Sequence, residues 1–332
     1  MGLGLSDQED LLFSMAGNID EAIKARLDKG TNILITSHIR PDGDAVGSLL
    51  GLGLALQNAG KNVQMVLTDG VSSSFKHLEG VDEIKTKMEG PYDTFITVDC
   101  ADYKRTGRSF AALGPPDVNI DHHVTNENFG KLNLIEGSEV ATSAILTNHL
   151  PAWGCEITRP VAAALLTGII TDTLGFRTSN VTPEALRQAA ALMDTGVDMP
   201  DLYMRGLIRR SYEAARYWGS GLSKLERKDG MVLCTLTNED RKAAGYSGND
   251  DADLINIVSA IDGFKVGLIF VEQPKKRVKI SWRALAPGIN VSKVAQHFGG
   301  GGHAAAAGAD VEGELEEIKK SVLKRSKEML SL

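Results

Sequence analysis

The stretch NILITSHIRPDGD, residues 32–44, joins a short apolar run to a loop that is rich in ligand-type side chains. The apolar run predicts a buried strand. The loop carries His38, Asp42 and Asp44, and its proline and glycine turn the backbone sharply, so the three side chains can point into one space. The structural alternative is an ordinary strand-to-helix turn with Asp44 as the N-cap. The stretch therefore predicts the start of an α/β fold and a candidate binding loop.

The same alternation of strand and helix continues along the chain. We expect further strands at residues 63–67, 94–98 and 118–120, and helices at residues 45–59, 160–171 and 182–196. Buried strands that alternate with helices are typical of a mostly parallel sheet flanked by helices. Ligands in such sheets bind beyond the carboxyl ends of the strands, where Asp99 and the triplet Asp121-His122-His123 would lie. The pattern predicts one crevice that these residues share with residues 38–44.

The length of 332 residues favours about two domains. We place a larger α/β domain at residues 1–196, a helical linker at residues 197–228 and a smaller α/β domain at residues 229–332. In the smaller domain we expect strands at residues 231–236, 265–271 and 277–282, and helices at residues 238–244, 253–260, 290–298 and 312–330. We expect the active-site cleft to lie between the two domains.

The predicted linker mixes cationic and aromatic side chains. It contains Arg209, Arg210, Tyr212, Arg216 and Tyr217. Such a mixture is one form of a stacking surface for nucleic acid. We favour the other interpretation, in which the segment is an interdomain or dimer-contact helix with a solvated basic face.

The composition restricts the kinds of substrate and compartment. A net charge of −7 disfavours a protein that coats long nucleic acid, because such proteins neutralise many phosphates with an extended basic surface. A small anionic substrate in a locally basic cleft suits the chain better. The three cysteines are scattered without paired spacing, which favours a reducing, cytoplasmic setting. No apolar run is long enough to span a membrane, and the acidic start of the chain lacks a secretory signal.

The carboxylates and imidazoles of these segments suffice for two divalent cations. His38 and Asp42 suit one cation, Asp44 faces a second, and Asp99 suits a bridging carboxylate. Asp172 follows the helix expected at residues 160–171, where only a bound cation makes a carboxylate favourable. Taken singly, Asp99 could simply end a strand and Asp172 could simply end a helix, without binding a cation. Together the segments indicate a metal-dependent phosphoesterase, since paired cations hydrolyse phosphate esters.

These four segments resemble motifs I to IV of the DHH phosphoesterase superfamily, which is named for an Asp-His-His triplet. The run Gly299-Gly300-Gly301-Gly302-His303 resembles the signature of the DHHA1 domain that follows in one branch. The resemblance implies two sets of metal ligands: His38, Asp42 and Asp99 for one cation, and Asp44, Asp99, His122 and Asp172 for the other. It also implies that His123 faces the scissile phosphate and that Asp121 orients a histidine. Mixed ligation by imidazole and carboxylate favours Mn²⁺, with Mg²⁺ as the alternative.

A second set of residues is expected to hold the far end of the substrate. It consists of Arg283, Gly299, Gly300, Gly301, Gly302 and His303. Arg283 can clamp a phosphate with two hydrogen bonds, and successive glycines can present backbone N–H groups to an anion. The alternatives are a surface salt bridge for Arg283 and a flexible linker for the glycines.

Among DHH branches, the chain resembles the compact nanoRNase and phosphoadenosine phosphatase group. That resemblance implies hydrolysis of short oligoribonucleotides to mononucleotides and of 3′-phosphoadenosine 5′-phosphate to AMP, and it suggests a homodimer. Two alternatives stay open. One is a phosphodiesterase that acts on cyclic or linear dinucleotides in signalling, and the other is a non-catalytic nucleotide sensor.

Overall fold

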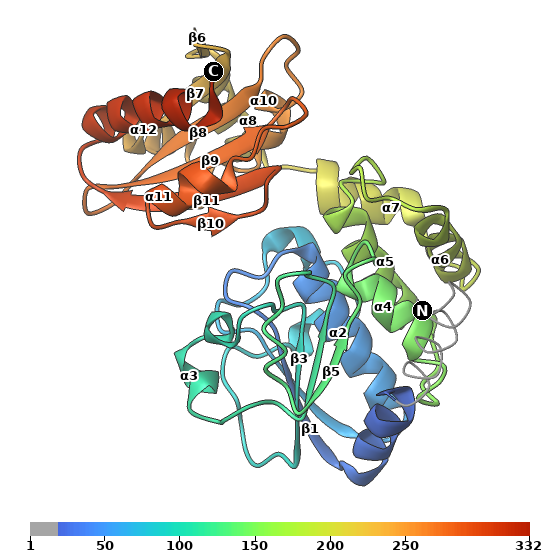
Figure 1. Ribbon diagram of the computed structural model, residues 1–332. Coiled ribbons are helices and arrows are strands. Elements are labelled where there is room, and N and C mark those ends of the chain that lie inside the picture. Colours follow the sequence, from blue (N-terminus) through green and yellow to red (C-terminus); the bar gives the residue numbers. More distant parts are fainter. Residues whose placement is uncertain (1–18) are drawn as a thin grey trace, which may run out of the picture. The chain divides into compact units, whose positions relative to one another are not determined.

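The computed structural model describes residues 19–332, which form two units, one that runs to Arg209 and one from Arg210 to Leu332 (Figure 1). The acidic start of the chain lies outside the described residues. Within residues 19–332, every helix is too short or too polar to traverse a bilayer. The division falls inside the predicted linker, so that segment is not a separate element. Its first part packs in the core of the first unit and its second part in the core of the second.

The first unit contains a five-stranded sheet in the order β2-β1-β3-β4-β5, and every strand pair in it is parallel. Its strands are β1 (Asn32–Thr36), β2 (Asn62–Val66), β3 (Thr94–Val98), β4 (Val118–Asp121) and β5 (Leu132–Ile135). The predicted parallel sheet is therefore confirmed, and the predicted strands lie within one residue of β1 to β4. The sequence analysis missed β5, a four-residue edge strand that contains an asparagine.

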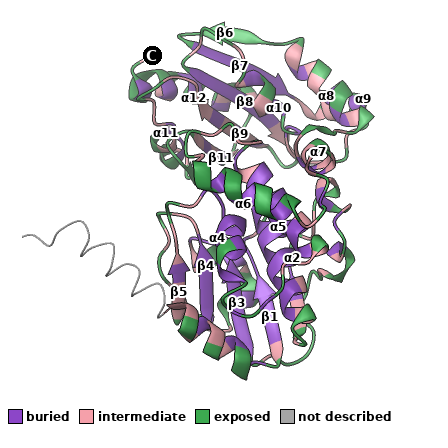
Figure 2. Cartoon of the chain, turned by 90° about the vertical axis from the view of Figure 1, so that its right-hand side faces the viewer, coloured by how far each residue is buried: buried purple, intermediate pink, exposed green. Residues whose placement is uncertain are grey.

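Helices cover this sheet and position the residues at its carboxyl edge. They are α2 (Gly43–Asn58), α3 (Arg108–Ala111), α4 (Thr142–His149), α5 (Arg159–Asp172), α6 (Pro183–Met193) and α7 (Met199–Tyr203), with a π-helical turn at Met204–Ile208. Alternate residues of β1 enter two different cores: Ile33 and Ile35 pack with α2, α4 and α5, whereas Leu34 packs with Phe110 of α3. In Figure 2, β1 and β3 are coloured as buried along nearly their whole length.

Close contact between α2 and α5 depends on glycine. A Cβ atom on Gly47 of α2 would lie 2.5 Å from the carbonyl oxygen of Ala164 in α5. A Cβ atom on Gly168 of α5 would collide with Ser143 at the start of α4. The small residues therefore let three helices meet beside the first turn of α2, where Asp44 lies.

The second unit contains a six-stranded mixed sheet in the order β10-β11-β9-β8-β7-β6. Its strands are β6 (Glu226–Lys228), β7 (Met231–Leu236), β8 (Val266–Gln273), β9 (Arg277–Ala284), β10 (Gly301–Gly302) and β11 (Ala306–Glu312). Its helices are α8 (Tyr212–Leu222), α9 (Asn238–Ala244), α10 (Leu254–Val258), α11 (Ser292–His297) and α12 (Leu315–Leu330). One face of the sheet packs on α11 and α12, and the other on α8, α9 and α10. The predicted smaller α/β domain is confirmed.

Candidate active site

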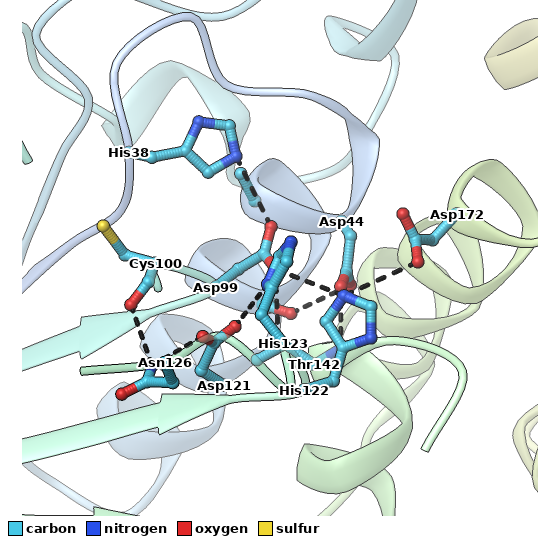
Figure 3. A network of polar contacts seen from close by, with 12 residues as sticks. His38, Asp44, Asp99, Cys100, Asp121, His122, His123, Asn126, Thr142 and Asp172 are labelled. Atoms are coloured by element: carbon cyan, nitrogen blue, oxygen red, sulfur yellow. Dashed lines mark hydrogen bonds and ion pairs between the residues drawn. The ribbon is translucent and has the colours of Figure 1, made fainter. Parts of the chain in front are cut away.

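The predicted ligand residues converge at the carboxyl edge of the first sheet (Figure 3). His38 and Asp42 come from the loop after β1, and Asp44 lies in the first turn of α2. Asp99 follows β3, and the Asp-His-His triplet begins at the last residue of β4. The C-terminal residue of α5, Asp172, completes the group. The geometry therefore brings residues from separate segments into one cluster.

Asp99 lies at the centre of the cluster, and its two carboxylate oxygens face different histidines. Oδ2 is 3.6 Å from Nε2 of His38, and Oδ1 is 3.8 Å from Nε2 of His122. The residue is buried and has a φ of 51°. This value lies in the left-handed region of backbone conformation, which residues other than glycine rarely adopt. Strained backbone of this kind tends to occur at functional sites, where the surrounding structure holds it in place. The arrangement is that of a carboxylate able to bridge two cations.

The expected ligands divide into two groups, and Asp99 is assigned to both because its Oδ1 faces His122; Asp99 also forms a compact cluster with His122 and His123. We call the group His38, Asp42 and Asp99 the outer site, and the group Asp44, Asp99, His122 and Asp172 the inner site. In the outer site, Asp42 Oδ2 lies 3.8 Å from His38 Nε2; in the inner site, Asp172 Oδ2 lies 3.6 Å from His122 Nε2.

These distances exceed ordinary hydrogen bonds, and they suit ligand atoms that surround an ion. Two ligand atoms at about 2.1 Å from the same cation lie roughly 3 Å or slightly more apart. Among the described residues, the potential ligand atoms of His38, Asp42 and Asp99, and those of Asp44, His122 and Asp172, lie within 4.8 Å of one another in each group. The spacing therefore fits small cations after a slight contraction.

The electrostatics of the cluster also fit a cation. Burial, with the charges of Asp44 and Asp99, raises the pKa of Asp172 to about 9. Burial and the charge of Asp99 raise the pKa of Asp44 to about 6. Burial would also raise the pKa of Asp99, but the close imidazole of His38 and the charges of His38, His122 and His123 together outweigh burial and lower it. The raised pKa values of Asp172 and Asp44 show that these crowded carboxylates lack compensating positive charge, which divalent cations would supply.

His123 is held by a chain of hydrogen bonds on the side away from Asp172. Its Nδ1 lies 2.7 Å from Oδ1 of the fully buried Asp121, and Asn126 donates to Oδ2 of Asp121 at 2.6 Å. Burial alone would lower the pKa of His123, but the hydrogen bond to Asp121 and nearby carboxylate charges raise it to about 9. Asp121 thus contacts a histidine in the manner expected of it. Asn126 was not among the predicted residues, although it lies only three positions after His123.

The sequence analysis also missed the groups that hold the inner site. The backbone carbonyl of Glu139 lies 3.4 Å from His122 Nδ1, so main chain orients this imidazole. Ser48, Thr142 and Ser143 surround the carboxylate of Asp44. A pair of hydroxyl residues before an apolar helical segment is a known start signal for a helix and could have located the start of α4. Its contact with Asp44 depends on tertiary packing.

In the second unit, Arg283 lies on β9 opposite Ala306 of β11, and its Nη1 donates to the carbonyl of Trp282 at 3.1 Å. Burial lowers the pKa of this guanidinium, while the charges of Asp251 and Asp253 act in the opposite direction. The guanidinium is therefore a half-buried cation with acidic neighbours, and its predicted contact with substrate stays a prediction.

In the run Gly299–His303, three backbone amides already have acceptors within the second unit, and the phosphate nest stays a prediction for the remaining groups. The N–H groups of Gly299 and Gly300 donate to carbonyls at the end of α11, and that of His303 donates to the carbonyl of Ala306. The run forms β10 and a tight turn into β11. Glycine is required there because a Cβ atom on Gly302 would lie 2.5 Å from the carbonyl oxygen of Ala306. Any substrate contact from this loop would rest on other groups, such as the exposed His303 side chain.

The basic and aromatic segment is not a continuous helix. It ends one unit and begins the other, and in the second unit Tyr217 is fully buried and stacks on Tyr246 with ring centroids 5.2 Å apart. Arg210 pairs with Asp253 at 2.5 Å. These contacts assign the segment mainly to packing within the units and disfavour a stacking strip for nucleic acid.

Known proteins resemble this chain along nearly its whole length. The model of the DHH family, N-terminal domain, matches residues 32–169, and the model of the DHHA1 domain matches residues 234–330. A Thermus thermophilus protein named bifunctional oligoribonuclease and PAP phosphatase NrnA is 34% identical over 304 residues, which is 90% of each chain.

Two solved structures share the fold. An exopolyphosphatase-related protein from Bacteroides fragilis superimposes with a TM-score of 0.86 and 25% identity, over 95% of this chain and 98% of that one. RecJ from Thermus thermophilus, in complex with Mn²⁺, has a TM-score of 0.56 and 15% identity, over 94% of this chain and 54% of that one, and so indicates the fold alone. The converging carboxylates and histidines, both domain models and the curated relative together confirm the resemblance: this chain belongs to the DHH family, in the branch that carries a C-terminal DHHA1 domain.

Proposed function

We propose that the protein is a metal-dependent phosphoesterase that hydrolyses short oligoribonucleotides to mononucleotides and 3′-phosphoadenosine 5′-phosphate to AMP. The observation that carries the proposal is the position of Asp99, whose two oxygens face His38 and His122 from between two groups of ligand atoms. The substrate class is supported by the name of the Thermus thermophilus relative, which covers 90% of both chains. The acidic composition agrees with a small anionic substrate.

The proposal assigns two divalent cations to the outer and inner sites, with Mn²⁺ as the first choice because both sites mix imidazole with carboxylate. When bound, such a pair supplies an activated water and neutralises charge on the phosphoryl group. Asp99 joins the two sites, and Asp121 lies behind His123. The position of Asp121, with no exposed surface, suits a residue that orients a histidine better than one that binds a cation.

His123 is the proposed donor to the phosphoryl group. The hydrogen bond to Asp121 favours the protonated ring and fixes it through Nδ1. A fixed imidazolium stabilises negative charge that develops on the phosphoryl oxygens, and it can protonate the leaving oxygen.

In the second unit, Arg283 and His303 are the proposed binding residues for the end of the substrate that is not cleaved. A guanidinium binds phosphate through two parallel hydrogen bonds, which suits the terminal phosphate of a short nucleotide. The three buried, unpaired cysteines support a reducing, cytoplasmic setting for this activity. A homodimer is the oligomeric state that we propose, and light scattering of the full chain tests it.

The first experiment compares substrates under Mn²⁺. End-labelled RNAs from dimers to about 24 nucleotides, 3′-phosphoadenosine 5′-phosphate, and linear and cyclic diadenylate are supplied separately, and we expect rates to fall steeply with RNA length because fewer conformers of a long chain place its end at the cations. Cleavage of cyclic diadenylate alone would favour the signalling phosphodiesterase. A tight nucleotide complex without turnover would favour the sensor.

The second experiment removes the shared carboxylate. Asp99→Asn keeps the size of the side chain, and asparagine tolerates the left-handed backbone, so the variant should fold. We expect turnover with Mn²⁺ to fall by about 10³-fold or more, because both cations lose a charged ligand. The control is Asp82→Asn, which removes an exposed carboxylate from the same unit. Activity close to wild type in the Asp99→Asn variant would refute the proposed site.

A further inference from the structure

The carboxylate of Asp44 is held more firmly than any other ligand of the cluster for which side-chain contacts are described. Its Oδ1 accepts hydrogen bonds from Ser48 Oγ at 3.1 Å, from the Ser143 amide at 3.0 Å and from Ser143 Oγ at 2.6 Å. Its Oδ2 accepts from the Thr142 amide at 2.7 Å. Because a carboxylate oxygen has about two lone pairs, Oδ1 is saturated and Oδ2 keeps capacity for a cation.

The donors to Asp44 come from a helix that the packing brings to it. Thr142 and Ser143 are the first two residues of α4. The N–H groups in the first turn of a helix have no acceptor within that helix, so they need partners from elsewhere. Gly168 of α5 leaves the space for this contact, since a Cβ atom there would lie 2.7 Å from Asp44 Oδ1 and would collide with Ser143. The start of α4 and the first turn of α2 therefore fit one another through the carboxylate.

Thr142 also connects Asp44 to the shared ligand. Its amide donates to Asp44 Oδ2 and its Oγ1 donates to Asp99 Oδ1 at 3.1 Å. That Asp99 oxygen is the one that faces His122. One residue thus fixes the spacing between two carboxylates of the inner site.

The outer site is supported on its histidine, whose Nδ1 lies 2.9 Å from the carbonyl of Ile39, but its own carboxylate, Asp42, is held less firmly than Asp44. The side chain of Asp42 is 61% exposed, and its Oδ1 caps α2 by accepting from the amides of Asp44 and Ala45 at 3.2 and 3.1 Å. Its other oxygen faces His38 at 3.8 Å. The outer site contributes two carboxylates and the inner site three, so both rigidity and charge favour a cation in the inner site.

We propose that Ser143 and Thr142 are positioning residues that fix Asp44 for a divalent cation. The inner site then binds its cation more tightly than the outer site, which is the first to lose its cation as the free metal concentration falls. The inference rests on the proposed function for the presence of cations, and it adds an order of occupancy that the function alone does not imply.

The test titrates the metal-free full chain with Mn²⁺ by calorimetry and by electron paramagnetic resonance. We expect two binding events in the wild type. Ser143→Ala should weaken the tighter event by about tenfold or more, as loss of a group that orients a metal ligand usually does. Asp42→Asn should weaken the weaker event and leave the tighter one within about twofold.

The matched control is Thr147→Val. Thr147 lies one turn further along α4, and its Oγ1 donates to the carbonyl of Ser143 at 2.8 Å. The variant therefore removes a buried hydroxyl from the same helix, but this hydroxyl does not bond to Asp44. Thermal unfolding in EDTA compares the stability of the two variants. Ser48→Ala provides a second route, because Ser48 donates to the same oxygen from α2. We expect it to weaken the tighter event by several fold.

The outcomes separate the inference from the proposed function. If Ser143→Ala and Ser48→Ala leave both events unchanged, or if Asp42→Asn weakens the tighter event, the positioning role is wrong even where RNA hydrolysis is observed. If the variants behave as expected but no phosphoester is cleaved, the positioning role stands and the proposed function fails. Absence of any Mn²⁺ binding to the wild type overturns both.

Discussion

Among its described residues, the first unit contains two partly buried pairs of histidine and aspartate that share one short contact. His123 Nδ1 lies 2.7 Å from Asp121, and His149 Nδ1 lies 2.7 Å from Asp20. They differ in their other carboxylate neighbours. The Nδ1 atom of His123 also lies 3.7 Å from Asp99 Oδ1 in the ligand cluster, whereas the Nε2 atom of His149 lies 3.1 Å from a second carboxylate outside that cluster, Glu136.

This difference separates a chemical role from a structural one. His149 connects the helix that ends at residue 29, the segment after β5 and α4, and Trp153 also donates to Asp20 at 2.7 Å. Both nitrogens of the His149 ring have a carboxylate partner within the protein, so the ring has no hydrogen-bonding capacity left for a ligand. A histidine beside an aspartate is therefore not enough to indicate catalysis, and its position relative to the ligand cluster decides.

The strongest challenge to this comparison is the replacement of His123. In His123→Gln we expect kcat to fall by about 10²–10³-fold with little change in KM, because general acid catalysis and charge stabilisation act mainly in the transition state. The free energy of unfolding should also fall, because the fully buried Asp121 loses its imidazole partner, so the kinetics are measured on a variant that urea unfolding shows to be folded. Steady-state kinetics on a dinucleotide under saturating Mn²⁺ measure the effect, and equal losses in His149→Gln would show that the two pairs do not differ.

The next effect comes from Asp121. Asp121→Asn keeps the shape but removes the charge that, with the hydrogen bond, raises the pKa of His123. We expect kcat to fall by about 10- to 100-fold, as is usual when a supporting carboxylate is lost. The alkaline limb of the kcat profile should also move to lower pH, because His123 then loses its proton sooner. An unshifted profile would contradict the orienting role of Asp121.

The sequence predicted the ligand cluster because its logic is local. Each of Asp99 and Asp121 stands at the end of an apolar strand, and parallel strands bring such ends together. The support of Asp44 was not predictable in this way, since it requires α4 to meet α2 across Gly168, a relation between distant segments. The sequence analysis did not predict β11, because alanine and glycine have low strand propensity. This strand forms through its pairing with β9.

A smaller effect is expected from His149, and it concerns stability. Replacing it with glutamine leaves Asp20 and Glu136 buried in part without their imidazole partner, which should lower the free energy of unfolding by about 1–3 kcal/mol. We expect kcat at saturating substrate to stay within about twofold, because the ring lies outside the ligand cluster. Urea unfolding in EDTA provides the measurement. A large loss of kcat in a folded variant would contradict the structural assignment.

The smallest expected effect is the pH dependence of that stabilisation. Burial alone would lower the pKa of His149, but its hydrogen bonds to Glu136 and Asp20 and their charges raise it above 6.5. A group whose pKa is higher in the folded protein stabilises the fold most when both states are protonated, and the contribution disappears as pH rises through the folded value. The difference in unfolding free energy between wild type and His149→Gln should therefore be largest near pH 6 and shrink toward pH 9. Because other groups titrate equally in both proteins, the difference isolates this histidine, and a gap that widened with pH would show that His149 is neutral in the folded protein.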